Sequence, residues 1–210
     1  TYENMKLDDK NLFAWLYGTR EGKNELGIKD KGTATDADQD VALALLFAYK
    51  KWGNLDYINQ AKKIINDIWE YETVEIKGER YVVAGNWASA KENKIYTVNP
   101  SYITPYAYRI FAEVDTQHNW NGLVDTSYEI LKKCSESTYG LDSSANIPPD
   151  WCALNKNGKI VIANTISDKS TNYSYDAIRS LWRIALDYRW NKEPRALIFL
   201  QKMDIWSREW

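Results

Sequence analysis

The chain has 210 residues, of which 27 are Lys or Arg and 29 are Asp or Glu, so its formal net charge is -2 at pH 7. Because the two signs are intermixed, the sequence has neither the basic stripe of a nucleic-acid-binding protein nor a polyacidic tail, and nucleic acid is not an expected partner. The length fits a single domain over residues 1–210. The longest apolar stretch, residues 41–49, is too short to span a membrane.

Helical periodicity dominates the chain. Apolar residues recur every three to four positions over residues 9–17, 38–52, 55–71, 102–113, 120–137, 175–189 and 192–207, with approximate ends. Short links join consecutive segments, as in antiparallel helical hairpins. Gly53 is a stop signal for the second helix, and Asn54 offers a cap for the third. The sequence therefore predicts an all-α domain built from helical hairpins.

Two short β-hairpins are expected to interrupt the helices. One covers residues 73–83 and turns at Lys77-Gly78, and the other covers residues 151–163 and turns at Asn157-Gly158. In both, apolar and β-branched residues flank a glycine-containing turn, which is typical of hairpins.

Three carboxylates crowd the beginning of the second helix, at Asp36, Asp38 and Asp40. They repel one another at this spacing, and only the N–H groups and dipole of a helix N-terminus offset part of that cost. Thr35 or Asp36 is expected to act as the N-cap, but a cap does not need three acids. The surplus indicates a functional site.

A second candidate site is the segment 173–183, in which Asp176, Arg179 and Arg183 share one helix face at i, i+3 and i+7. A cation beside a carboxylate keeps it ionised and fixes its rotamer, as a general base requires. An isolated Asp-x-x-Arg would be read as an ordinary intrahelical ion pair. Next to the acidic segment, the catalytic interpretation is favoured.

Both segments resemble signature elements of glycoside hydrolase family 8, also called the cellulase D family. The signature runs Ala, Ser or Thr, Asp, Ala or Gly, Asp, then an apolar helix closing on an aromatic residue. The matching residues here are Ala34, Thr35, Asp36, Ala37, Asp38, Ala42, Leu45, Ala48 and Trp52. Val41 departs from the usual Ile or Met. Residues 173–183 resemble the family's Tyr-Asp-Ala-x-Arg-x-x-Trp-Arg element, and the family's Asn-Pro-Ser-Tyr and Pro-Asp-Trp elements have matches at 99–102 and 149–151.

The resemblance implies an (α/α)6 six-hairpin barrel and an inverting glycosidase. Such an enzyme uses one carboxylic acid to protonate the leaving oxygen and a separate carboxylate to activate water. By resemblance Asp176 is the base, and Tyr175 and Arg179 orient it and the water. Asp36 is catalytic by resemblance too: it either hydrogen-bonds the distorted sugar or, in signature-based descriptions, is called the nucleophile. Because inversion has no covalent intermediate, the positioning role is preferred.

The family's general acid is a Glu in a Ser-Glu-Gly-x-Gly-Tyr-Gly segment upstream of the signature, and no such segment occurs in these residues. Glu21 precedes a glycine but lies too close to the signature to be that residue. We therefore expect an incomplete family 8 domain, lacking the acid at one end and further helices at the other. Apolar faces left without partners would favour instability or self-association.

The aromatic composition supports a sugar site, since 10 Trp and 15 Tyr stand against only 4 Phe. Trp and Tyr stack on sugar rings while their polar atoms reach hydroxyl groups or water. A single aromatic residue within helical spacing is more simply core packing. Trp87, Tyr102, Tyr106 and Trp151 are expected on loops or helix starts, so these are the candidates for substrate binding.

Other chemistries find little support. Cys134 and Cys152 are too few for a disulfide framework and match no metal-ligand spacing, although a single bridge stays open. His118 is the only histidine, which excludes a His-based triad and disfavours a zinc site. No cofactor or metal is expected.

The expected function is hydrolysis of β-1,4-glucan in polysaccharide degradation or metabolism. The alternatives are a non-catalytic carbohydrate-binding remnant of the same fold, an enzyme acting on xylo-oligosaccharide or chitosan and, well behind, a helical scaffold without sugar contact. A secreted or periplasmic location is inferred only from where a polymeric substrate would be met.

Overall fold

The structure, a computed structural model, describes residues 2–19, 22, 25–89, 94–164, 166 and 170–203. Its elements in chain order are α1 (Tyr2–Met5), β1 (Ala14–Thr19), β2 (Leu26–Thr33), α2 (Thr35–Trp52), α3 (Leu55–Tyr71), β3 (Thr73–Ile76), β4 (Glu79–Val82), α4 (Asn86–Ser89), β5 (Ile95–Val98), the 3-10 helix η1 (Pro100–Tyr102), α5 (Pro105–Val114), α6 (Trp120–Glu136), β6 (Cys152–Asn155), β7 (Ile160–Val161), α7 (Arg179–Asn191) and α8 (Pro194–Met203).

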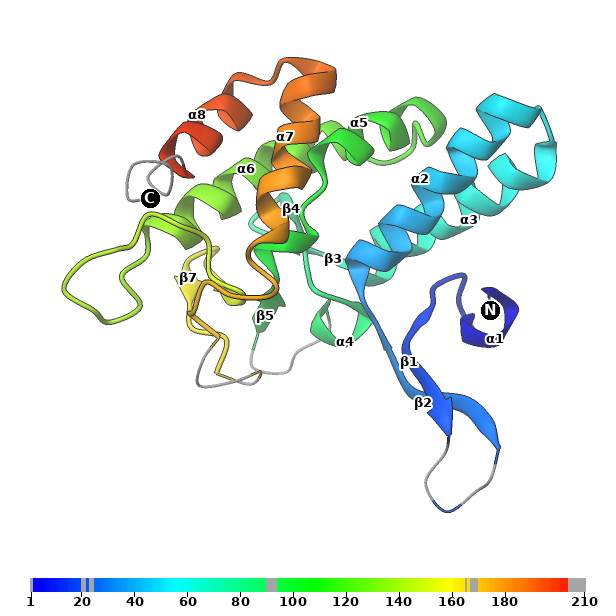
Figure 1. The fold of residues 1–210 in the computed structure, drawn as a ribbon, viewed down its shortest axis with the longest axis horizontal. Coiled ribbons are helices and arrows are strands. Elements are labelled where there is room, and N and C mark those ends of the chain that lie inside the picture. Colours follow the sequence, from blue (N-terminus) through cyan, green and yellow to red (C-terminus); the bar gives the residue numbers. More distant parts are fainter. Residues whose placement is uncertain are drawn as a thin grey trace.

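The long helices form consecutive antiparallel pairs, α2 with α3, α5 with α6 and α7 with α8 (Figure 1). The α2–α3 connection has the local chemistry that the sequence predicts. Gly53 adopts a left-handed conformation with φ 70° and donates its N–H to the carbonyl of Tyr49. Asn54 then caps α3 by accepting the N–H of Asp56 at 2.9 Å. The predicted helical-hairpin architecture is confirmed.

Small antiparallel sheets accompany the helices. The expected β3–β4 hairpin is present, and Lys77 and Gly78 at its turn have φ values of 55° and 84°, as a two-residue turn with two positive φ angles requires. The expected β6–β7 hairpin is present too, with Gly158 at φ 73°, and β5 extends it to three strands. The β1–β2 hairpin, in blue at the lower right of Figure 1, extends away from the helices.

Some expected helices differ from the observed ones. The helix expected over residues 9–17 is wrong, because residues 14–19 form β1 and pair with β2, a contact outside that sequence window. The helix expected from residue 175 begins at Arg179. The helix expected over residues 192–207 begins at Pro194, where a proline suits the first turn; Met203 is its last described residue, and residues 204–207 lie outside the described part.

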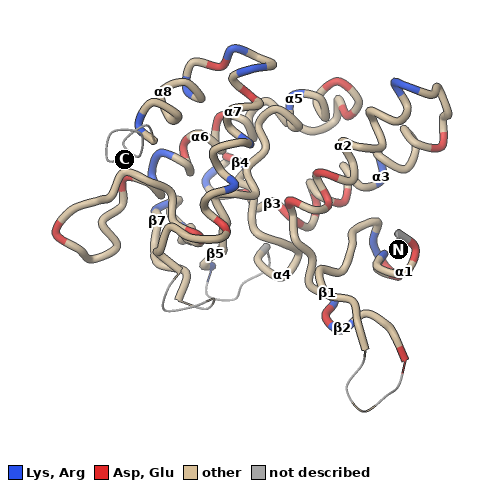
Figure 2. Tube along the Cα trace, viewed as in Figure 1, with Lys and Arg blue, Asp and Glu red and all other residues tan. Residues whose placement is uncertain are grey.

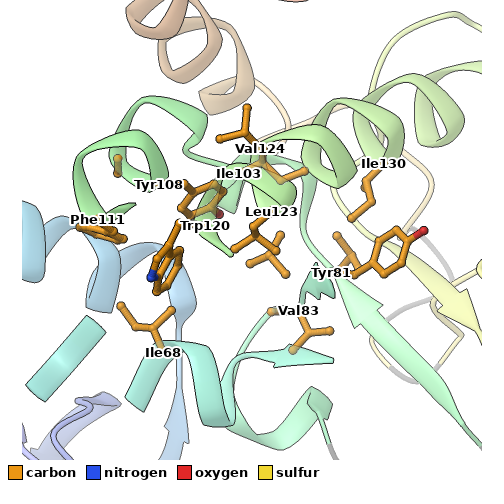
Figure 3. Close-up of a cluster of buried hydrophobic side chains, with 14 of the residues drawn as sticks. Ile68, Tyr81, Val83, Ile103, Tyr108, Phe111, Trp120, Leu123, Val124 and Ile130 are labelled. Carbon is orange, nitrogen blue, oxygen red and sulfur yellow. The ribbon is translucent and has the colours of Figure 1, made fainter. Parts of the chain in front are cut away.

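A cluster of buried hydrophobic side chains, part of a larger core, lies between α3, α5, α6 and the β4 strand (Figure 3). Trp120 at the beginning of α6 is fully buried, and its ring centroid lies 5.2 Å from that of Phe111 and 5.9 Å from that of Tyr108. Ile68 of α3 and Val83 after β4 belong to the same cluster. Burying rings of this size makes α6 a rigid base for the strands that lie on it.

Cys134 of α6 and Cys152 of β6 form a disulfide, which settles the possibility that the sequence left open. Both cysteines are fully buried. The bridge ties the sheet strand that directly follows Trp151 to the rigid core helix. It therefore restrains one wall of the site described below.

The apolar face of α2 is covered only in part. Val41, Leu45 and Ala48 are half-buried, and the rings of Phe47 and Trp190 meet at a centroid distance of 6.1 Å while both stay substantially exposed. Within the described residues, no helix is both long enough and apolar enough to cross a membrane.

Candidate active site

The acidic segment lies at the beginning of α2, where Figure 2 shows negative charges gathered at the middle of the molecule. The expected side-chain cap is wrong: Ala34 is the N-cap residue, and no side chain caps the helix. Thr35 Oγ1 instead donates to the carbonyl of Val83 at 2.7 Å. Asp36 Oδ1 accepts the N–H of Ala37 at 3.0 Å. The segment is thereby anchored to the strand end after β4.

A single guanidinium joins the two residues that the sequence assigns to catalysis. Arg179 Nη1 donates to Asp36 Oδ2 at 3.0 Å, and Arg179 Nη2 donates to Asp176 Oδ1. The Asp176–Arg179 pair expected from the sequence is confirmed. Its extension to Asp36, which is 143 residues away from Arg179, could not be read from helical spacing. Both carboxylates therefore lie around one positive charge.

Arg183 takes a different partner from the one that its spacing suggests. Its Nη1 and Nη2 atoms donate to the two oxygens of Asp40 at 2.9 and 2.8 Å, and Nη2 lies 3.8 Å from Asp36 Oδ2. The Arg183 side chain is almost fully buried, and it also donates to Tyr106 Oη at 3.2 Å. Such bidentate pairs fix geometry as well as charge. Asp40 therefore holds Arg183, as a helix-packing partner should.

The electrostatics of the site follow from burial and charge. Burial raises the pKa of Asp36 above its ordinary value, although Arg183 and Arg179 oppose the rise. Burial, with Asp36 and Asp176 adding to it, raises the pKa of Tyr102 to about 12. The Tyr102 hydroxyl is therefore protonated at neutral pH and available as a donor.

Asp176 sits on a turn that a buried carboxylate organises. Asp150 Oδ1 accepts the backbone N–H groups of Ser174 and Ala177 at 3.0 and 2.7 Å, and Asp150 Oδ2 accepts the Ser174 hydroxyl. Only 8 % of Asp150 is exposed. Sequence reasoning gave Asp150 no role, although its place in the Pro-Asp-Trp element was a usable signal. Asp150 is thus a positioning residue for Asp176.

A groove of about 700 Å³ runs past Asp176, whereas Asp36 lies beside it and is not among its lining residues. It is lined by Trp15, Asp30, Gly32, Thr33, Ala34, Ala84, Asn86, Trp87, Tyr102, Trp151, Ile166 and Asp176. The ring of Trp151 lies 6.4 Å from that of Trp87 and 5.8 Å from that of Tyr102, measured between centroids. Arg179 lies over the Tyr102 ring, 5.4 Å from its centroid. The groove therefore combines an aromatic wall with the carboxyl group of Asp176, which pairs with Arg179.

Three of the four expected aromatic binding residues, Trp87, Tyr102 and Trp151, line the groove, whereas Tyr106 is buried and holds Arg183. Tyr175 is 90 % exposed and is not among the lining residues. Trp15 lines the groove and was missed, because its segment was expected to be a helix.

Metal and histidine chemistry have no visible place here. In the described part of the chain, no group of three or more His, Cys, Asp or Glu side chains could hold a metal ion. His118 Nδ1 lies 2.7 Å from Asp115 Oδ2, and its ring stacks on Trp69 with a centroid distance of 4.8 Å. These contacts give His118 a packing role.

The arrangement can support acid–base work on a sugar. Flat aromatic faces suit the C–H faces of pyranose rings, and a half-buried carboxylate held by an arginine suits activation of water. A carboxylate with a raised pKa, such as that of Asp36, suits hydrogen bonding to hydroxyl groups nearby.

Comparisons with known proteins identify the family. The family model described as "Glycosyl hydrolases family 8" matches residues 1–205. Endoglucanase C of Ruminiclostridium cellulolyticum is 35 % identical over 199 residues, which are 93 % of this chain and 38 % of that protein. Beta-glucanase of Niallia circulans is 28 % identical over 204 residues, 95 % of this chain and 47 % of that protein.

The crystal structure of endoglucanase Cel10 from Klebsiella pneumoniae, a family 8 glycosyl hydrolase, superposes with a TM-score of 0.80 at 25 % identity. The match covers 100 % of this chain and 62 % of that one. The α/α-barrel fold expected from the sequence is confirmed. The chain spans less than half the length of the two curated relatives. It belongs to glycoside hydrolase family 8.

Proposed function

We propose that this chain forms the base side of an inverting glycoside hydrolase that cleaves β-1,4-glucan. The observation that carries the proposal is the Arg179 bridge, which brings Asp36 and Asp176 together at the edge of an aromatic groove. The relatives described above are an endoglucanase and a beta-glucanase, which supports the reaction class and the substrate.

In this proposal the glucan chain lies along Trp15, Trp87 and Trp151. Asp176 takes a proton from a water molecule, which attacks the anomeric carbon from the face opposite to the leaving oxygen. Arg179 holds the Asp176 carboxylate in place through their ion pair. Asp36 hydrogen-bonds the hydroxyl groups of the sugar at the cleavage point.

The leaving oxygen needs a proton from a second carboxylic acid. The other carboxylate lining the groove, Asp30, is unsuited because the N–H of Gly32 and the Trp15 side chain lower its pKa. We place the general acid in a part of the protein outside the described residues. The larger size of the relatives supports this placement.

A secreted or periplasmic location is part of the proposal. A polymeric substrate is met outside the cytoplasm, and the Cys134–Cys152 disulfide suits an oxidising compartment. Self-association through the partly covered face of α2 stays a prediction.

The competing functions differ from the proposal in different ways. A carbohydrate-binding remnant would bind sugar in the groove without hydrolysing it, whereas an enzyme for xylo-oligosaccharide or chitosan would hydrolyse a different polysaccharide. The names of the two relatives, endoglucanase and beta-glucanase, favour β-glucan as the substrate.

The test is hydrolysis of carboxymethyl-cellulose by the longest natural form of the protein, with reducing ends counted. Asp176→Asn should abolish turnover while sparing affinity for cello-oligosaccharides. Asp56→Asn, an exposed change at the beginning of α3, is the matched control and should leave both unchanged. Turnover retained by Asp176→Asn would refute the assignment of the base. Inactivity of the unaltered protein, with binding kept, would establish the remnant.

A further inference from the structure

Asp38 and Glu72 form a buried pair of acids behind the groove, outside the residues assigned to catalysis. Asp38 is on the first turn of α2, and Glu72 is the residue at which α3 ends. Both side chains are 0 % exposed. Ionised carboxylates are almost never buried without a compensating partner, because desolvation of the charge is costly.

Each carboxyl group has one oxygen with an ordinary donor. Asp38 Oδ1 accepts the backbone N–H of Phe13 at 2.9 Å, and Glu72 Oε1 accepts the hydroxyl of Thr33 at 2.5 Å. The two carboxyl groups are also within hydrogen-bonding reach of each other. The remaining oxygens, Asp38 Oδ2 and Glu72 Oε2, are buried and have no hydrogen-bond donor among the residues that the structure describes.

Among the described residues, no cation is among the main influences on the pair. Asp36 adds a further negative charge, and the groups that face the pair from the N-terminal segment, β2 and α2 are the N–H of Phe13 and the hydroxyls of Thr33 and Thr35. Glu72 also lies at the C-terminal end of α3, where the helix dipole disfavours negative charge. Burial is the main cause that raises the pKa of both carboxyl groups; the charge of Glu72 adds to the rise for Asp38, and the charge of Asp36 adds to the rise for Glu72.

We infer that Asp38 and Glu72 share one proton, and that this proton locks together the segments that position Asp36. One proton between two carboxyl groups satisfies both orphaned oxygens and leaves a single negative charge, as in other carboxyl pairs that share a site. A pair without a proton would repel, and a pair with a metal ion would need more ligands than the described residues offer.

The pair joins four segments of the chain. Phe13 belongs to the N-terminal segment, Thr33 ends β2 and lines the groove, and Asp38 lies half a turn beyond Asp36 on α2. Glu72 adds the end of α3, and its carbonyl accepts the N–H of Val83 at 2.9 Å. Loss of the proton should push these segments apart and displace Asp36 from Arg179.

The shared proton has a signature in stability. The pKa values of both carboxyl groups are raised in the folded protein. Above about pH 4 the folded pair therefore keeps a proton that the carboxyl groups of the unfolded chain have already released. The stabilisation is therefore complete in acid and is lost as pH rises toward the upper pKa of the pair. For one proton, the unfolding constant rises about tenfold per pH unit over that interval.

The experiment is denaturant unfolding of this chain from about pH 5 upward, for the wild type and for the double variant that combines Asp38→Asn and Glu72→Gln. The amide side chains of this variant keep the shape of the two acids but do not titrate. The ratio of the wild-type unfolding constant to that of the double variant should rise about tenfold per pH unit. Asp67→Asn is the matched control, since Asp67 is buried and accepts the backbone N–H of Asn11 but has no acidic partner. The ratio of the wild-type unfolding constant to that of Asp67→Asn should not change with pH. A flat ratio for the double variant would overturn the inference.

If the double variant does not fold, carbon-13 NMR of the wild type decides. The carboxyl carbons of Asp38 and Glu72 should titrate together in two steps, the second well above the range of exposed carboxyl groups. Two independent titrations near ordinary values would refute the shared proton.

A last measurement tests the positioning of Asp36 and rests on the proposed function. Affinity for a cello-oligosaccharide should fall as the pair loses its proton, and much less in the double variant. Equal loss in both proteins would overturn the positioning role. Absence of affinity at every pH in the wild type would count against the proposed function instead, while the stability measurement would still decide on the proton.

Discussion

Asp150 is the residue on which the position of the proposed base should depend most. Asp150→Ala removes the acceptor for the backbone N–H groups of Ser174 and Ala177. Ala177 is fully buried, so water cannot replace the lost acceptor, whereas Ser174 is half-buried. An unsatisfied buried donor costs about 1–3 kcal/mol and a lost bond to a charged group about 1.5–3 kcal/mol. We expect Asp150→Ala to lower the free energy of unfolding by about 3–5 kcal/mol.

Two further variants separate the parts of this contribution. Asp150→Asn keeps Oδ1, which accepts both N–H groups, and changes only the atom that faces the Ser174 hydroxyl. Its cost should be about 1 kcal/mol, similar to that of Ser174→Ala, which removes the same bond. Asp142→Ala, in an exposed part of the preceding loop, is the control and should cost less than about 0.5 kcal/mol.

Denaturant unfolding of this chain measures the stability order, and hydrolysis by the longer protein measures the effect on Asp176. A displacement of the base by about 1 Å costs on the order of a hundredfold in rate, so Asp150→Ala should lower kcat far more than it raises KM. Equal destabilisation by Asp150→Ala and Ser174→Ala would refute the reasoning, because the two backbone bonds would then contribute nothing.

Three other changes test the site and its support. Arg179→Lys should lower hydrolysis about 10–100-fold, since one ammonium cannot replace the fork that bridges two carboxylates, and an unchanged rate would contradict the bridge. Reduction of the Cys134–Cys152 disulfide, which closes a loop at a sequence separation of 18, should lower the free energy of unfolding by about 3 kcal/mol. Denaturant unfolding with and without reductant measures the difference, and equal stability in the two conditions would contradict the prediction. Trp15→Ala should weaken oligosaccharide binding about 2–12-fold by titration calorimetry, whereas Trp52→Ala, at the far end of α2 and 65 % exposed, should not.

The parts of the fold that the sequence predicted correctly carry local signals. The α2–α3 hairpin has Gly53 at its left-handed stop and Asn54 at its cap, and the β3–β4 turn has Gly78 where a positive φ is needed. These features act within a few residues, so they can be read without knowing the rest of the chain.

The parts that were missed depend on distant partners. β1 was taken for a helix because its short apolar run fits either period, and only pairing with β2 decides. β5 pairs with β6 across more than fifty residues, a contact that no local pattern indicates. The predicted helix beginning at residue 175 starts later, because Asp150 captures the N–H of Ala177 in a turn.

The candidate site divides in the same way. The Asp176–Arg179 pair could be predicted because its spacing lies within one segment, whereas the catalytic roles of Asp36 and Asp176 stay predictions. The pairing of Arg183 with Asp40 could not, because spacing says which face a side chain occupies but not which helix lies opposite.

The crowding of three acids on the first turn of α2 has a physical explanation in the helix period. Positions 36 and 40 lie one turn apart and face α7, where each carboxylate meets a guanidinium. Position 38 lies on another face and meets a second acid, Glu72, with which we infer that it shares a proton. Repulsion among the three is thus offset by a different partner for each. Loss of Arg179 or Arg183 should therefore raise the pKa of Asp36 further, because both guanidinium groups oppose the rise that burial causes, whereas loss of Glu72 should lower the pKa of Asp38.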